Sequence, residues 1–242
     1  MQTEILYEDN DIMIIYKPAG LAAQTARVGQ PDVASELKNY LARSGGKDIP
    51  VKKPPYLGVI HRLDQPVEGV MIFAKNKKAA SLLGKQLAGQ GEESGFCKHY
   101  YAVVCGRPGK KEGQLTDYLY KNQENRAVIA EASQAGQQAA RKAVLRYRIL
   151  ELLEEQGLAL ADICIETGRF HQIRAQMAHA GMPLLGDLKY GNEETKQMAR
   201  ALGVPYVALC ACRLECIHPV SGKRISINAK PRNRAFSFFS QL

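Results

Sequence analysis

Short apolar runs with the alternation of β-strands, separated by tight-turn residues, recur along the chain and constrain its fold most strongly. The segment EILYEDNDIMIIYKPAG (4–20) predicts two strands around an Asp-Asn-Asp turn, closed by a Pro-Ala-Gly turn. Residues 142–149 alternate as a half-exposed strand does, and 211–228 predict a hairpin with its turn near 219–222. Further strands are predicted over 57–64, 69–75, 96–106 and 158–166.

Helical spacing of apolar residues is scattered between these strands. It predicts helices over 33–46, with Asp32 as a cap, and over 77–89, 170–181 and 193–203. No Pro/Gly/Ser-rich linker, low-complexity tract or internal repeat divides the chain. We therefore expect an α+β fold with a mixed, largely antiparallel central sheet flanked by helices and loops, in a single domain over 1–242.

The charge of the chain is basic: 33 Lys and Arg against 24 Asp and Glu give a net charge of +9. Both halves carry the excess, which favours a polyanionic partner such as RNA or DNA. A basic protein without such a partner is an equally good reading of charge alone. The longest stretches without Asp, Glu, Lys or Arg, 175–186 and 201–212, are too short for a membrane span, and the acidic start is no signal peptide. We expect a cytoplasmic protein.

The six cysteines are expected to be reduced thiols in that compartment. Three cysteines, Cys210, Cys212 and Cys216, are candidate zinc ligands. However, the segment YVALCACRLECI alternates as a strand, so all three side chains lie on one face of it. The C-x-C-x-x-x-C spacing also lacks the C-x-x-C pair typical of structural zinc sites. A buried strand face is the favoured interpretation, and we expect no metal and no cofactor.

The segment HRLD (61–64) is the first cluster that stands apart from packing. Polar side chains here end an apolar strand and meet a proline-bearing loop, a place where folds present reactive groups. The competing interpretation is an ordinary strand end at which Arg62 and Asp64 form a solvated pair.

The second cluster lies in TGRFHQIRAQMAHAGMPLLGDLKYG (167–191). On a helix starting near Phe170, His171 and Arg174 share one face. Arg169 and Arg174 then lie near a helix N-terminus, where backbone N–H groups favour anions. Phosphate binding, or pairing with a buried carboxylate, is one reading, and a stripe of solvated charge is the other.

These motifs resemble those of the RluA-type pseudouridine synthases. The likeness is carried by HRLDQPVEGVMIFAKN, KHYYAVVCG and TGRFHQIRAQMAHAGMPLLGDLKYG, with YKPAGL (16–21) similar to the first motif of the family and HPVSGKRISI to its closing hairpin. It extends over residues 7–227. The resemblance implies the pseudouridine synthase catalytic fold, and we expect no auxiliary N-terminal RNA-binding domain, because the first strand begins within the first ten residues.

The resemblance also implies roles for individual residues. Asp64 matches the nucleophile, Arg62 the side chain that enters the RNA stack when the uridine flips out, and Tyr100 the tyrosine against the uracil ring. Arg174 matches the arginine that pairs with the catalytic aspartate. The implied reaction converts uridine in structured RNA, ribosomal or transfer, to pseudouridine without cofactor or metal, in a monomer. The substrate-binding residues expected on the same basis are His61, Arg62, Arg169 and His171.

Four positions depart from the family pattern. Val67-Glu68 replaces the usual Thr-Ser pair, while Gln176 and Cys210 each stand where a histidine is common. None of these changes removes an implied catalytic residue, but they bear on RNA positioning and on the choice of substrate.

Two other functions remain open from the sequence. One is a catalytically silent RNA-binding protein of the same fold. The other is a metal-dependent hydrolase, for which the ligands would be His61, Asp64, His171 and His179. No H-E-x-x-H or comparable spacing supports the hydrolase.

Overall fold

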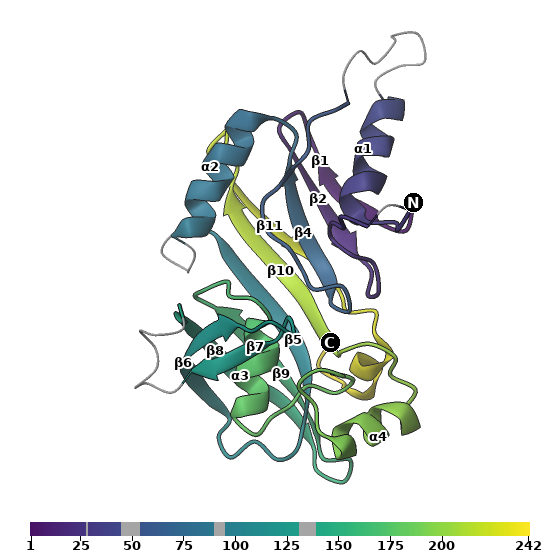
Figure 1. Ribbon diagram of the computed structural model, residues 1–242, viewed down its shortest axis with the longest axis vertical. Coiled ribbons are helices and arrows are strands. Elements are labelled where there is room, and N and C mark those ends of the chain that lie inside the picture. Colours follow the sequence, from purple (N-terminus) through teal and green to yellow (C-terminus); the bar gives the residue numbers. More distant parts are fainter. Residues whose placement is uncertain (28, 45–53, 90–94, 131–138) are drawn as a thin grey trace. The chain divides into compact units, whose positions relative to one another are not determined.

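The chain forms two compact units, shown in the computed structural model of Figure 1. The first unit contains Met1–Phe96 and Arg213–Ala229, and the second contains Cys97–Cys212 and Lys230–Leu242. A single catalytic domain over 1–242 stays a prediction. The residues that the structure describes are 1–27, 29–44, 54–89, 95–130 and 139–242.

The first unit combines antiparallel strands with two helices among its described residues. Its elements are β1 (Glu4–Glu8), β2 (Ile12–Lys17), α1 (Val33–Ser44), β3 (Gly58–Val59), β4 (Glu68–Ala74), α2 (Lys77–Ala88), part of β10 (Leu209–Ile217) and β11 (Arg224–Asn228). Neighbouring strands run in the order β1-β2-β4-β10, with β3 paired to β4 and β11 to β10. The pairs β1–β2, β2–β4, β3–β4 and β10–β11 are antiparallel.

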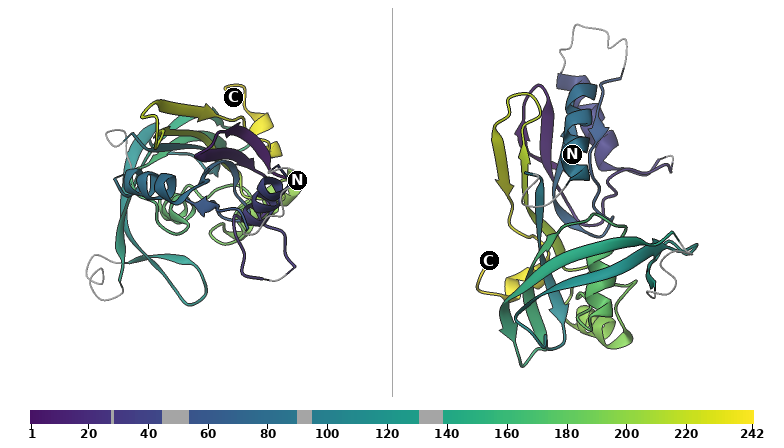
Figure 2. Two further views of the ribbon diagram at one scale, coloured as in Figure 1. Left: turned by 90° about the horizontal axis from the view of Figure 1, so that it is seen from above. Right: turned by 90° about the vertical axis from the view of Figure 1, so that its left-hand side faces the viewer.

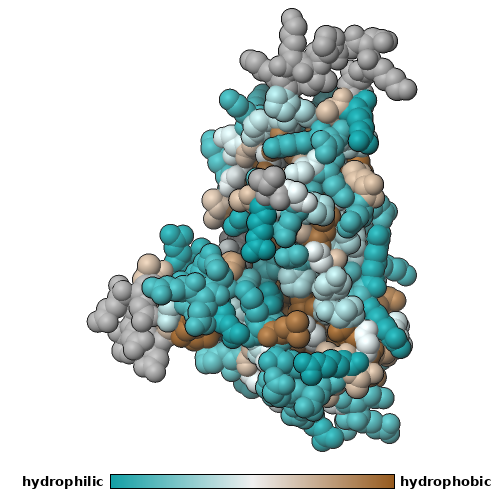
Figure 3. Space-filling view, turned by 45° about the vertical axis from the view of Figure 1, so that its right-hand side comes forward, coloured by the Kyte–Doolittle hydropathy of each residue, from teal (hydrophilic) through white to brown (hydrophobic). Residues whose placement is uncertain are grey.

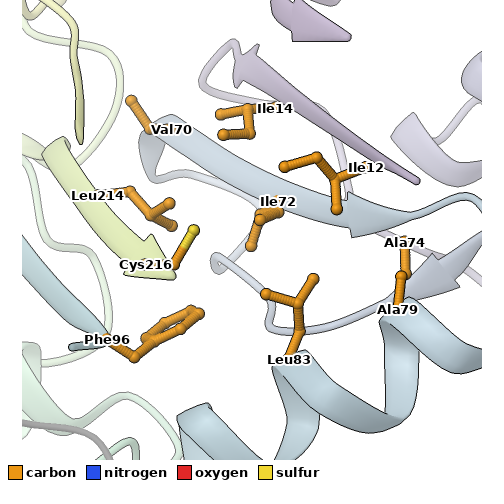
Figure 4. Packing of buried hydrophobic residues seen from close by; sticks show 10 residues of the cluster. All are labelled: Ile12, Ile14, Val70, Ile72, Ala74, Ala79, Leu83, Phe96, Leu214 and Cys216. Atoms are coloured by element: carbon orange, nitrogen blue, oxygen red, sulfur yellow. The ribbon is translucent and has the colours of Figure 1, made fainter. Parts of the chain in front are cut away.

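Helix α2 covers the apolar core of this unit (Figure 4). Ala79 and Leu83, one helical turn apart, are fully buried against the strands. The helix starts where predicted, because the Asn76 side chain accepts a hydrogen bond from the Ala79 amide at 2.8 Å. The core cluster consists of Ile12, Ile14, Val70, Ile72, Ala74, Ala79, Leu83, Phe96, Leu214 and Cys216.

Strands β2 and β4 are buried along their whole length, so both faces of this part of the sheet are covered. Helix α1 contributes Val33 and Leu37, which are fully buried. The predicted cap is confirmed: Asp32 Oδ1 accepts a hydrogen bond from the Ser35 amide at 2.7 Å. The last two residues of the predicted helix, 45 and 46, lie outside the described residues.

The second unit is a curved antiparallel sheet with helices at its side (Figures 1 and 2). Its elements are β5 (Cys97–Cys105), β6 (Glu112–Lys121), β7 (Ala127–Ala130), β8 (Arg141–Leu153), β9 (Leu158–Ile165), α3 (Gln172–His179), α4 (Glu193–Ala201) and the short 3₁₀ helix η3 (Arg234–Phe238). The strands follow the order β5-β9-β8-β6-β7, and each of these pairs is antiparallel.

Four elements differ from the sequence predictions. The strand predicted over 57–64 is limited to β3, and His61–Asp64 have no regular structure. Strands β6 and β7 were not predicted, because β6 is half exposed and carries few apolar residues to set a period. The helix predicted from Phe170 begins only at Gln172, since His171 has a left-handed backbone with φ of 50°.

The α+β class with a mixed, largely antiparallel sheet is confirmed. Charged and polar side chains cover most of the face shown in Figure 3. Among the helices in the described part of the chain, none is long and apolar enough to span a membrane.

Candidate active site

The loop after β3 presents two of the predicted site residues in the first unit. Arg62 is exposed, Leu63 is buried, and Asp64 is half-buried. The amide of Val67 donates to the carbonyl of Asp64 at 3.0 Å, closing a turn directly before β4. The buried Leu63 thus anchors the loop between a guanidinium open to solvent and a partly shielded carboxylate.

A buried lysine braces this loop against the turn that follows β2. Lys17 is the last residue of β2, has no exposed surface, and donates from Nζ to three carbonyl oxygens. These belong to Pro18 (2.9 Å), Leu21 (2.6 Å) and Gln65 (3.0 Å). The Gly20 amide adds a hydrogen bond to the Gln65 carbonyl at 2.9 Å. The YKPAGL turn therefore holds the residue next to Asp64.

Burial lowers the pKa of Lys17 to about 7, while the charges of Asp64 and Glu68 act in the opposite direction and favour the ammonium. Glu68 is the first residue of β4 and is 3% exposed. Glu68, which replaces the serine of the usual family pair, is thus a buried carboxylate whose charge acts on the buried Lys17. The sequence alone did not show this interaction.

Replacing Lys17 by Met should lower the free energy of unfolding by about 3 kcal/mol, because three buried carbonyl oxygens lose their donor. Chemical denaturation monitored by circular dichroism measures this difference. The exposed Lys38 on α1 supplies the control, since Lys38→Met should change stability by less than about 0.5 kcal/mol. Equal effects of the two substitutions would contradict the bracing role.

His61 lies within the fold rather than on its surface. It is 9% exposed, its Nε2 accepts a hydrogen bond from the Ile72 amide at 3.3 Å, and its ring meets Phe96 edge-on at 6.2 Å between centroids. These contacts tie the start of the Asp64 loop to β4. The geometry supports a positioning role for His61 better than direct contact with a substrate.

In the second unit, β5 carries Tyr100, which is 6% exposed and lies opposite Ile163 of β9. Strand alternation places Lys98 on the same face. Lys98 is 5% exposed, and burial lowers its pKa to about 8. Sequence reasoning did not assign Lys98, although its spacing of two from Tyr100 was a signal that both share one face.

Arg174 forms a buried bidentate ion pair, but its partner in the second unit is Asp187. Nε donates to Oδ2 at 2.7 Å and Nη2 to Oδ1 at 2.8 Å. Gly186 makes the turn before Asp187 with φ of 77°, where a Cβ would overlap the carbonyl oxygen of Tyr206. Sequence reasoning missed Asp187, whose signal was the unassigned Gly-Asp pair in PLLGDLKYG.

Burial by itself would raise the pKa of Asp187, but Arg174 and the amides of Lys189 and Tyr190 hold this pKa below its ordinary value of 3.8. Because the pKa is depressed in the folded chain, the stabilisation is complete above about pH 4. It is lost as the pH falls through the folded value.

The Asp187→Asn variant should unfold with a free energy lower by about 3–5 kcal/mol at neutral pH, because the Arg174 charge is left buried without a carboxylate. The gap between wild type and variant should shrink as the pH falls below about 4, in denaturation series at several pH values. Glu154→Gln, on an exposed turn, is the control and should leave this pH dependence unchanged. A gap that is constant with pH would argue against the depressed pKa.

His171 and Arg169 precede α3 instead of lying on it, so the predicted shared helical face of His171 and Arg174 is wrong. His171 Nδ1 lies 2.8 Å from the Tyr190 hydroxyl, which also accepts a hydrogen bond from the Ala127 amide at 2.7 Å. Arg169 Nε donates to the Lys142 carbonyl at 2.9 Å. Tyr190, which sequence reasoning left unassigned, therefore links His171 to β7.

Asp64 and Arg174 belong to different units, so their predicted pairing stays a prediction.

Two departures from the family pattern, Gln176 and Cys210, lie in the second unit. Gln176 has no exposed surface and donates from Nε2 to Asp117 Oδ2 at 2.7 Å. Cys210 is likewise fully buried within β10. Both residues are therefore part of the interior of the second unit.

The metal-hydrolase hypothesis finds no support among the described residues. Two groups there have the donor types and spacing for a metal, and neither includes any of its proposed ligands. Cys210, Cys212 and Cys216 are buried along β10, as the predicted strand face requires. The two groups are Asp9, Asp11 and His218, and Cys97, His99 and Cys164.

Comparison with known proteins adds a family match to this geometry. The model of a family described as RNA pseudouridylate synthase matches residues 11–179. The chain is 30% identical over 228 residues to the "Uncharacterized RNA pseudouridine synthase YhcT" of Bacillus subtilis, covering 94% of this chain and 68% of that protein. It is 31% identical over 230 residues to "Ribosomal large subunit pseudouridine synthase D" of Zymomonas mobilis, with coverage of 94% and 68%.

A solved structure shares the fold. "Human RNA Pseudouridylate Synthase Domain Containing 1" superposes with a TM-score of 0.72 at 19% identity, over 95% of this chain and 83% of that one.

Proposed function

The chain belongs to the RNA pseudouridylate synthase family, which isomerises uridine in RNA, and we propose that Asp64 is the nucleophile of this reaction. The supporting observation is the Asp64 loop, in which a half-buried carboxylate follows an exposed arginine and is braced by the Lys17 ammonium. A carboxylate attacks as a nucleophile in its ionised form.

The isomerisation moves one bond and one proton. The bond from C1′ to N1 breaks, the uracil turns, C1′ bonds to C5, and the proton lost from C5 is balanced by one gained at N1. Tyr100 offers an aromatic face for the ring and a hydroxyl able to relay that proton. Arg174 is the third catalytic residue that we propose, and Asp187 fixes its guanidinium within the second unit.

Arg62 acts on the RNA rather than on the bond being broken. Its exposed guanidinium is flat and cationic, so it stacks and hydrogen-bonds in the gap left by a flipped uridine. Arg169 and His171 lie near the start of α3 and contribute to substrate binding. His61 supports the loop from inside.

The RNA we propose as substrate is ribosomal RNA of the large subunit, on the basis of relatives named for that activity. Transfer RNA is the other candidate. A net charge of +9 suits either polyanion. The enzyme would act as a cytoplasmic monomer without cofactor. Mapping pseudouridines in cellular RNA with and without this gene tests the target: loss of a mark only in transfer RNA would reject the ribosomal assignment.

Substituting Asp64→Asn should reduce pseudouridine formation by more than about a thousandfold, because the amide keeps the shape but removes the nucleophile. Single-turnover assays on the mapped RNA measure the rate, and filter binding checks that affinity is retained. Glu124→Gln, which removes a carboxylate from an exposed turn, should retain full activity. Substantial turnover by the Asp64→Asn variant would overturn the assignment. A wild-type chain that binds this RNA without product would instead identify a silent RNA-binding protein.

The Arg62→Ala variant should slow turnover of a stably folded RNA roughly thirtyfold, if its help in base flipping amounts to about 2 kcal/mol. Affinity should change far less. The defect should shrink on a version of the RNA in which the target uridine lies in a flexible loop. Arg43→Ala, an exposed arginine on α1, is the control. Should Arg62→Ala lose the same factor on both RNAs, or lose affinity and salt dependence instead of rate, the residue binds phosphate.

A further inference from the structure

Two thiols and an imidazole converge on one face of the second unit, across the β5–β9 pair. His99 of β5 lies directly opposite Cys164 of β9, and Cys97 lies two residues before His99 on the same face. Each residue offers one ligating atom, and these atoms all lie within 4.8 Å of one another. The two sulfur atoms are 3.7 Å apart.

This spacing is that of a tetrahedral zinc site. With Zn–S bonds of about 2.3 Å, two sulfur ligands of a tetrahedron lie about 3.8 Å apart. Two thiolates and one neutral imidazole are ligand types that zinc prefers, and the two negative charges balance the ion. Cys97 is 5% exposed, whereas Cys164 and His99 are half-buried, so an ion has a route in from solvent.

The surroundings of the three residues favour the metal-binding form. Asp162, two residues from Cys164 on the same face, places Oδ1 3.6 Å from His99 Nδ1. A carboxylate beside a ligating histidine orients the ring, or fills the fourth position. In the sheet register, β8 brings Arg146 beside Cys164 and Arg148 beside Asp162. Both arginines lie beside carboxylates: Arg146 Nη2 is 2.7 Å from Glu166 Oε1, and Arg148 Nη2 is 3.7 Å from Asp162 Oδ2.

We propose that Cys97, His99 and Cys164 bind one Zn²⁺ ion, with Asp162 or water completing the coordination. Both thiols release their protons when the ion binds. The ion would join β5 to β9 on the face opposite to the one that carries Tyr100, because adjacent residues of a strand point to opposite faces. Its role is therefore structural. The inference is independent of the RNA chemistry and of which uridine is modified.

The test uses the full chain, stripped of metal with a chelator under reducing conditions and titrated with Co²⁺ and then Zn²⁺. One Co²⁺ per chain should produce near-ultraviolet thiolate charge-transfer bands and the visible d–d bands of tetrahedral cobalt. Zn²⁺ should displace it and raise the melting temperature. Absence of the charge-transfer bands in the wild type would overturn the proposal, as would a Cys97–Cys164 disulfide forming in place of metal uptake.

Variants separate these ligands from other metal-binding groups. Cys164→Ser and His99→Gln should each abolish the tetrahedral spectrum, and the second remains decisive if the first does not fold. Asp162→Asn should weaken Zn²⁺ binding by about 10–100-fold while keeping the spectrum. Cys105→Ala, at the other end of β5, is the matched control and should bind normally. Thiolate bands that persist in both ligand variants would place the metal elsewhere.

Discussion

A buried ammonium group holds together the part of the first unit that carries Asp64, the proposed nucleophile. Lys17 donates to three carbonyl oxygens in two loops, and the most distant acceptor, Gln65, lies 48 residues along the chain. Neither loop has the regular backbone hydrogen bonds of a helix or a sheet, so the Lys17 ammonium supplies donors to its carbonyl groups. Since Asp64 and Glu68 both favour the charged form of Lys17, replacing either carboxylate should also alter the protonation of this lysine.

In the second unit, buried polar side chains of one helix make the corresponding contacts. Helix α3 is buried at every position from Gln172 to Met177. It therefore differs from an amphipathic surface helix, which would expose one face of such a stretch to solvent. The polar side chains of this stretch are satisfied inside the protein: Gln172 by the Val144 carbonyl, Arg174 by Asp187. Because Arg174 donates two hydrogen bonds to one carboxylate, its guanidinium has one orientation.

The sequence predicted the strands whose apolar period is strong, such as β2, β4 and β9. It also predicted the helix cap at Asp32 and the hairpin that β10 begins. It failed where tertiary contacts decide. The left-handed backbone of His171 delays the start of the predicted helix to Gln172, and β6 is held by pairing rather than by its own pattern. Among site residues, local motifs pointed to Asp64 and Arg174. Asp187 and the brace at Lys17 depend on partners distant in sequence, which spacing alone does not show.

The discontinuity of the first unit bears on how the protein is made. Its core cluster joins Ile12 and Val70 to Leu214 and Cys216, so residues near the two ends of the chain share one interior (Figure 4). On a ribosome, the early strands emerge long before the segment that completes their packing. Until then β4 presents an uncovered edge and exposed apolar side chains, a state prone to aggregation. Synthesis of this enzyme should therefore depend on chaperones for most of translation, and truncation before residue 213 should leave an insoluble fragment.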